Sequence, residues 1–164
     1  MNNDSSETAA AMLDQTFSSD LRYLMAVSYI VLSNNQVTSR HIEREYQMPV
    51  HAWSALYAIT EFPGLRSKDI QHLFPRPQNS ISRVVRLLID RNLVEEEVSS
   101  TDARAKLLYA TDKGTELLNE IKAKALARQA EMLGSLDAEE REVFLNLCRK
   151  IAADPGLRQS DAMP

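Results

Sequence analysis

The chain has 164 residues, of which 44% are hydrophobic and 26% are charged, and its formal net charge at pH 7 is −4. This length fits one domain with added helices, and the composition is typical of a globular protein. The single cysteine, Cys148, excludes an internal disulfide framework and a cysteine-based zinc site. The chain has no run of about 18 apolar residues. Its first 20 residues contain four acidic and no basic residues, unlike a secretory signal. We therefore predict a cytoplasmic protein without membrane contact.

The N-terminal part of the chain is predicted to be helical after a polar start. Residues 1–14 are small and polar, which predicts a disordered leader. Apolar residues at helical spacing then predict a helix over 17–32, which ends at a polar Ser-Asn-Asn-Gln run, and a short helix over 39–46. The next helix covers 50–62, where a Pro-Gly pair ends it.

The second half of the chain changes from helical spacing to a short strand pattern and back. In chain order the predicted elements are helix 66–73, helix 77–92, strand 93–98, strand 106–111, helix 112–133 and helix 138–152. The two strands are joined by a polar loop and predict a β-hairpin with an exposed tip. Asp137 and Glu140 predict a capping box at the start of the last helix. Three helices followed by a hairpin predict a winged helix-turn-helix in a mainly α (α+β) chain.

The predicted helix 77–92 has one apolar and one polar face. At about 100° per residue, its branched apolar residues gather on the side that faces a core. The opposite side carries amide, hydroxyl and guanidinium groups, which are the groups that read base edges in the major groove of DNA. The residues opposite the core are Asn79, Arg83 and Arg86, flanked by Ser80 and Ser82, and Gln78 near the helix start is a further candidate. These six residues are called the polar stripe below.

Basic residues are concentrated around this helix. The 27 residues 66–92 include six basic and two acidic residues, so this segment has a charge of +4, against −8 for the remainder. Arg66, Lys68 and Arg76 belong to this segment outside the polar stripe. We expect them to contact phosphate groups, because neutralising phosphates supplies most of the sequence-independent affinity for DNA.

The tip of the predicted hairpin adds Asp102, Arg104 and Lys106. An arginine on an extended tip can enter a narrow minor groove, where the electrostatic potential is most negative. Asp102 is expected to orient Arg104 by a charge-assisted hydrogen bond. The hairpin tip is therefore predicted to contact DNA together with the helix.

Five short motifs follow one another between residues 52 and 120. They are FPGL at 62–65, NSISRVVRLL at 79–88, DRNLVE at 90–95, DARAK at 102–106 and LYATDKG at 108–114. With these motifs, the chain resembles the MarR family of bacterial transcriptional regulators. The hairpin motif followed by Leu-x-x-Thr-x-x-Gly is the most specific of them. The chain departs from the family pattern at Arg66, where a small polar cap is usual, and at 75–77, where the turn contains two prolines.

The resemblance implies a homodimer that binds a pseudo-palindromic double-stranded DNA operator, most often as a repressor, and that a small, frequently aromatic, effector releases. It implies dimerisation helices within 15–48 and 113–153, a DNA-binding lobe over 49–112 and a tail over 154–164. The candidate residues for holding an aromatic acid or its derivative are Tyr23, Met25, His41, Arg44, Tyr46 and Trp53.

Other chemistry receives less support from the sequence. The three histidines lie on different predicted elements without a neighbouring nucleophile motif, so we predict no enzyme activity and no cofactor. His41 and Glu45 lie one helical turn apart, but two ligands make an incomplete metal site, and we predict none. Cys148 is predicted to be a buried structural thiol, with a redox-sensing thiol as the alternative. The alternative function is a winged-helix module for protein contacts that binds no operator.

Overall fold

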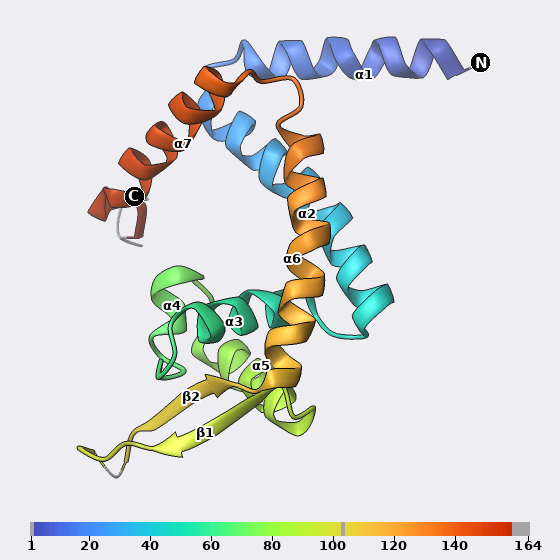
Figure 1. Ribbon diagram of the computed structural model, residues 1–164. Coiled ribbons are helices and arrows are strands. Elements are labelled where there is room, and N and C mark those ends of the chain that lie inside the picture. Colours follow the sequence, from blue (N-terminus) through green and yellow to red (C-terminus); the bar gives the residue numbers. More distant parts are fainter. Residues whose placement is uncertain (1, 103, 159–164) are drawn as a thin grey trace. The chain divides into compact units, whose positions relative to one another are not determined.

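The computed structural model describes residues 2–102 and 104–158 (Figure 1). The chain divides into two compact units, residues 1–119 and 120–164, and one helix continues from the first into the second. In chain order the described elements are α1 (Asn2–Phe17), α2 (Arg22–Tyr46), α3 (Val50–Glu61), α4 (Ile70–Leu73), α5 (Gln78–Asp90), β1 (Val94–Val98), β2 (Lys106–Ala110), α6 (Asp112–Met132), α7 (Ala138–Ala153) and the 3-10 helix η1 (Pro155–Arg158).

Helices α3, α4 and α5 pack with the β1–β2 hairpin and form the winged helix-turn-helix that the sequence predicts (Figure 1). Their fully buried side chains come from α3, α4, α5 and β2, and burying each of them contributes about 1.5–3 kcal/mol. They are Leu56, Ile59, Ile70, Val84, Leu88 and Leu108. The predicted fold class, mainly α with a small hairpin, is confirmed.

The hairpin is tied to the helices by a short third segment. Leu65 forms an isolated antiparallel bridge with Leu108. The main-chain N–H of Leu108 donates to the carbonyl of Leu65, and that of Gly64 donates to the carbonyl of Leu108, each over 2.9 Å. Gly64 has φ of 85°, and a Cβ there would lie 3.3 Å from the hydroxyl of Tyr109, so glycine suits this approach. The bridge places the residues after Leu65 beside the hairpin.

Several predicted helix boundaries were wrong. The helix predicted to begin at residue 17 begins at Arg22, because Phe17 is the last residue of α1. The polar run at 33–36 does not end a helix, because α2 continues through it to Tyr46. Ser and Asn are only moderately poor helix formers, Gln is a good one, and the chain has no proline or glycine before Pro49. The predicted helix 66–73 shrinks to the four residues of α4, because residues 66–69 form a turn.

The leader also differs from the prediction. Residues 2–17 form helix α1 instead of an irregular segment. A run of three alanines, Ala9 to Ala11, raises the helix propensity of this segment. The ring of Phe17, at the end of α1, contacts Tyr29 of α2 edge to face, with 6.0 Å between ring centroids. Polarity alone therefore misled the prediction of a disordered leader.

The second unit contains the end of α6, α7 and η1. The capping box predicted at α7 is present: Asp137 Oδ1 accepts from the N–H of Glu140, and Glu140 Oε2 accepts from the N–H of Asp137, both over 2.9 Å. Cys148 is exposed, so the prediction of a buried thiol was wrong for the single chain. The apolar stripe of α7 exists, but none of its residues is buried in one chain. The tail begins with η1, and residues 159–164 lie outside the described residues.

No helix among the described residues is both long and apolar enough to cross a membrane.

Candidate nucleic-acid interface

Helix α5 separates its apolar and polar residues as its sequence predicts. Ile81, Val84, Val85 and Leu88 are each at most 3% exposed. Of the polar stripe on the other side, Ser80 is half-buried and the remaining five residues are exposed. The Arg86 side chain is 75% exposed. The core thus holds α5 by one face and leaves the amide and guanidinium groups of the other face exposed to solvent.

Pro77 and the turn before it form the start of α5. Pro77 occupies the N-cap position rather than the predicted first helical position. Its carbonyl accepts from the N–H of Ser80 over 2.9 Å, which closes the first turn. The preceding turn is held by Gln71, whose side-chain amide donates to the carbonyl of Arg76 over 2.6 Å. These contacts fix where the polar stripe begins.

A cleft of about 330 Å³ lies between the turn that precedes α4 and the tip of the hairpin. The residues that line it are Arg66, Ser67, Lys68, Asp102, Arg104, Ala105 and Lys106. Four of them are cations and one is an acid, so the cleft is suited to an anion such as a phosphate group. The structure thereby brings together five residues that the sequence placed in two separate segments.

The wall of the cleft on the α4 side is a closed turn. Asp69 Oδ2 accepts from both the main-chain N–H and the Nε of Arg66, over 3.0 and 3.1 Å. Burial raises the pKa of Asp69, but these hydrogen bonds and the charges of Arg66 and Lys68 outweigh it and leave the pKa below its usual value. Asp69 therefore remains ionised and stabilises the turn that presents Arg66 and Lys68.

The wall on the hairpin side differs from the prediction in one contact. Asp102 Oδ1 accepts from the main-chain N–H of Arg104 over 3.0 Å, so it shapes the turn of the tip. The predicted bond from Asp102 to the guanidinium of Arg104 is not made among the described contacts. The side chain of Arg104 therefore stays exposed at the end of the hairpin.

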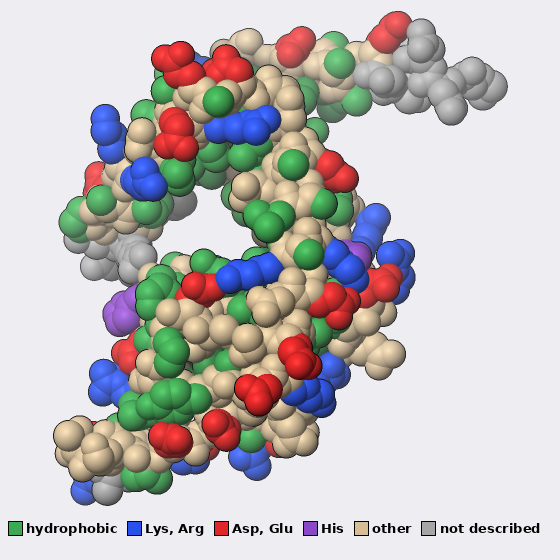
Figure 2. Space-filling view, viewed as in Figure 1, with side chains coloured by type: hydrophobic (Ala, Val, Ile, Leu, Met, Phe, Trp, Pro, Cys, Tyr) green, Lys and Arg blue, Asp and Glu red, His purple; other side chains and the backbone are tan. Residues whose placement is uncertain are grey.

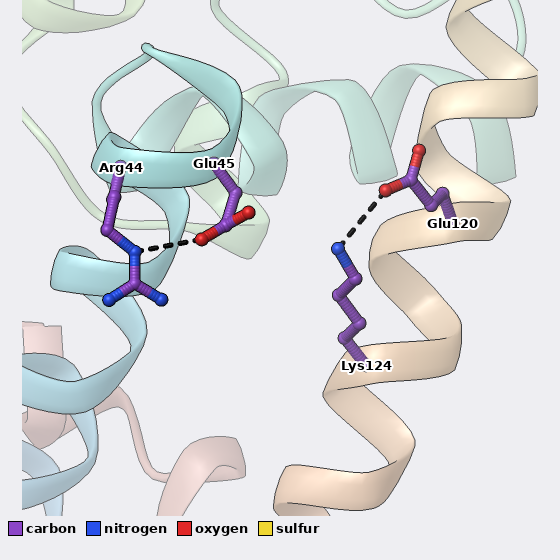
Figure 3. Close-up of polar contacts among 4 residues, drawn as sticks. All are labelled: Arg44, Glu45, Glu120 and Lys124. Atoms are coloured by element: carbon purple, nitrogen blue, oxygen red, sulfur yellow. Dashed lines mark hydrogen bonds and ion pairs between the residues drawn. The ribbon is translucent and has the colours of Figure 1, made fainter.

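The six candidate effector residues are not brought together within one site of the first unit. Tyr23 and Arg44 both lie on α2, 21 residues apart, which is roughly 30 Å along a helix. Tyr23 is 75% exposed, and Met25 is exposed as well. Arg44 Nε forms an ion pair with Glu45 Oε1 over 2.8 Å (Figure 3). The second ion pair drawn in the figure joins Lys124 to Glu120 over 3.1 Å and lies within α6.

The candidates near the end of α2 and on α3 lie in aromatic contacts. His41 and Tyr46 meet edge to face, with ring centroids 6.1 Å apart, and Trp53 meets Tyr57 in the same way at 6.3 Å. His41 Nε2 is buried and lacks a hydrogen-bond partner among the described residues. A buried imidazole nitrogen without a partner is costly, so a bound polar group there would lower the free energy.

Sequence reasoning missed three residues of this region. Ser67 lines the cleft between two basic neighbours. Glu96 pairs with Lys106. Arg91 donates from its two terminal nitrogens to the carbonyls of Tyr46 and Gln47, over 2.9 and 2.6 Å. Only the position of Ser67 between Arg66 and Lys68 gave a local signal, because the other two contacts join distant parts of the chain.

No group of three His, Cys, Asp or Glu side chains in the described part of the chain lies close enough to hold a metal ion.

Comparison with known proteins places this lobe in a family. Residues 46–105 match the family model described as MarR family. This segment is therefore similar to the MarR family. The match runs from the end of α2 through α3, α4, α5 and β1 to the tip of the hairpin. The resemblance predicted from the five motifs is confirmed.

Solved structures of MarR-family regulators share the fold over more than this domain. The transcriptional regulator SlyA is 16% identical, with 82% of this chain and 95% of that chain covered and a TM-score of 0.69. A protein assigned to the MarR family from Listeria monocytogenes, complexed with 26-mer DNA, is 19% identical over 79% of this chain and 88% of that chain, with a TM-score of 0.73. The PcaV regulator of Streptomyces coelicolor, in complex with its natural ligand, is 20% identical over 84% of this chain and 94% of that chain, with a TM-score of 0.66. This chain therefore has the fold of MarR-family transcriptional regulators.

Proposed function

We propose that this chain is a homodimeric, sequence-specific DNA-binding transcriptional regulator that acts as a repressor in the cytoplasm. The observation that carries the proposal is the combination, on one lobe, of the exposed polar stripe of α5 with the cationic cleft beside the hairpin. The stripe supplies groups for base edges, and the cleft supplies groups for phosphates. The Listeria relative complexed with DNA supports the same reading.

The proposal divides the interface residues by role. Gln78, Asn79, Ser80, Ser82, Arg83 and Arg86 face bases in the major groove. Arg66, Lys68 and Arg76 hold phosphates, and Arg104 and Lys106 reach the backbone or the minor groove from a tip shaped by Asp102. Charge repulsion does not forbid this arrangement, because the segment 66–92 is positive within an acidic chain.

Dimerisation is proposed because two helices leave apolar side chains without cover in a single chain. Tyr23, Leu24 and Val27 of α2 are each more than half exposed. Leu147 and Ile151 of α7 are also more than half exposed, and hydrophobic side chains reach the surface in Figure 2. Apolar surface of this extent usually marks an interface. Light scattering after size exclusion should give twice the mass of one chain, and a monomer would contradict the proposed homodimer.

An effector that releases the DNA is proposed by analogy with the PcaV complex and from the residues near His41. Its chemical class is an aromatic acid or a derivative. His41, Tyr46 and Trp53 offer rings and a partnerless imidazole nitrogen, whereas Tyr23, Met25 and Arg44 join only if a second chain completes the site. The effector can release DNA only if it binds the free conformation more tightly than the DNA-bound one.

The deciding experiment selects an operator from a random duplex pool with the purified chain. If two α5 helices enter successive major grooves, the selected half-sites lie about 10 bp apart. Arg83→Ala should then lower the affinity for the selected site by about 1–3 kcal/mol and relax specificity at one base pair. Arg66→Ala should weaken selected and random duplexes equally. Equal losses from both variants on both duplexes would contradict the division of roles.

The salt response distinguishes this function from the alternative, a module for protein contacts, which the acidic remainder of the chain favours. A dimer with about 6–10 phosphate contacts loses about 10³–10⁵ in affinity between 50 and 200 mM salt. A flat salt response, or no duplex binding at any salt concentration, would favour the protein-contact module.

A further inference from the structure

Several cations of the proposed DNA interface already have a carboxylate partner within the chain. Arg66 pairs with Asp69 over 3.1 Å, Arg86 pairs with Asp90 over 3.5 Å, and Lys106 pairs with Glu96 over 2.6 Å. Acidic and basic side chains are accordingly intermixed over the winged-helix lobe in Figure 2. The shortest of these pairs, at Lys106, is also the one that joins two strands.

The register of the hairpin decides which glutamate reaches Lys106. Residues 95, 96 and 97 of β1 are all glutamates. Lys106 stands opposite Val98, and Glu96 stands opposite Leu108. Since side chains alternate between the faces of a strand, Glu96 shares a face with Val98, Leu108 and Lys106, whereas its two neighbours point to the other face. Glu96 is therefore the diagonal neighbour of Lys106.

This pair lies on the face of the hairpin that borders the cleft. Leu108 on the same face is fully buried, and Lys106 itself lines the cleft with Arg66 and Lys68. The side chain of Glu96 is 27% exposed, against 64% for Lys106. The carboxylate is thus the more sheltered member, and it pairs with the ammonium group of a lysine that lines the cleft.

A phosphate at the cleft meets a penalty in either arrangement of this pair. If Lys106 turns fully toward the phosphate, the ion pair with Glu96 is lost. If the ammonium group uses its three donors to contact both, the carboxylate is held within several ångströms of the phosphate, and the two negative charges repel. Both outcomes weaken binding to DNA of any sequence.

We infer that Glu96 is an intramolecular competitor of DNA phosphate for Lys106, and that it sets the absolute affinity and the salt dependence of DNA binding. This inference rests on the proposed function, because duplex DNA must be the anion in question. Sequence discrimination stays with the polar stripe of α5, since contacts to phosphates carry no base information. Because the contacts to the DNA backbone are weakened in this way, an effector can release the complex more easily.

The three consecutive glutamates provide a matched control. Glu96→Gln and Glu97→Gln change the net charge of the chain by the same amount, but only the first frees Lys106. The probe is a random-sequence duplex of about 30 bp, roughly three helical turns. Binding is measured by fluorescence anisotropy from 50 to 200 mM salt, and thermal unfolding of each variant verifies that it folds.

Glu96→Gln should bind the random duplex about two- to fivefold more tightly per hairpin than Glu97→Gln at 50 mM salt, the range expected for releasing an exposed ion pair. Its log–log salt slope should be steeper by as much as about 0.9 per hairpin. In a Lys106→Gln background the two glutamate variants should bind equally, because the competition has been removed.

The possible outcomes separate this inference from the function on which it rests. Wild-type binding with a steep salt response, but equal affinities for Glu96→Gln and Glu97→Gln, overturns the inference and leaves the proposed function standing. Weaker binding by Glu96→Gln overturns it as well, since Glu96 would then assist Lys106. Absence of wild-type duplex binding at every salt concentration overturns both.

Discussion

Gly114 of helix α6 lies against the main chain of Leu93, the residue before β1, so its replacement by alanine is predicted to be strongly destabilising. A Cβ built on Gly114 would lie 2.0 Å from the carbonyl oxygen and 3.0 Å from the carbonyl carbon of Leu93. Carbon and oxygen atoms require about 3.3 Å. The start of α6 would therefore have to withdraw by about 1.3 Å, because a main-chain carbonyl cannot rotate away as a flexible side chain can.

That displacement strains the contacts which tie α6 to the end of α5. The hydroxyl of Thr111 donates to the carbonyl of Asn92 over 2.8 Å, and the main-chain N–H of Thr111 donates to the carbonyl of Leu93 over 3.1 Å. Overpacking costs about 1–3 kcal/mol, and weakening each hydrogen bond adds about 0.5–1.5 kcal/mol. We expect Gly114→Ala to lower the free energy of unfolding by about 3 kcal/mol, and Tm by about 6–12 °C.

The assay is thermal and urea unfolding at one protein concentration, because Tm depends on concentration for a chain that self-associates as proposed above. Gly134→Ala is the matched control. Its Cβ would lie 3.3 Å from the carbonyl oxygens of Ala130 and Glu131, a contact that a shift of a few tenths of an ångström relieves. The free energy of unfolding of this variant should stay within about 1 kcal/mol of the wild-type value. A Gly114→Ala variant as stable as Gly134→Ala would refute the argument, because α6 would then shift without cost.

Two further predictions concern contacts that join distant segments. Arg91→Met removes both donors to the carbonyls of Tyr46 and Gln47, so the free energy of unfolding should fall by about 2 kcal/mol. An unchanged urea midpoint would exclude this role. Burial, and then the charge of Arg76, lowers the pKa of His51 below 6.5. The unfolded chain then binds the proton more readily, so stability falls as the pH drops below about 6.5. His51→Gln should flatten the pH dependence of the urea midpoint below that value. Identical pH profiles for the wild type and His51→Gln would contradict this role of His51.

Local signals in the sequence sufficed to predict helices α3 and α5 and the hairpin of the winged-helix lobe, but not the extent of α4. Helix α5 follows from apolar residues at 3.6-residue spacing, and the hairpin follows from the change to strand spacing around a polar loop. The capping box of Asp137 and Glu140 also involves residues only three apart. Each of these features depends on neighbours along the chain, so periodicity and capping rules predict it. The polar stripe of α5 belongs to the same class, because the core face of a helix determines its opposite face.

Only the tertiary structure decided how these elements meet. The cleft exists because the bridge between Leu65 and Leu108 brings two basic segments together across more than 30 residues of sequence. The partner of Lys106 depends on the register of the hairpin, and one residue of slip would present the neighbouring glutamates instead. Cys148 is exposed although it lies on the apolar face of α7, because an apolar helix face is buried only where another surface covers it. The sequence by itself thus determined α3, α5, the hairpin, α6 and α7 and which of their faces are apolar, whereas the extent of α1, α2 and α4, burial and ion pairing depended on contacts that local patterns do not show.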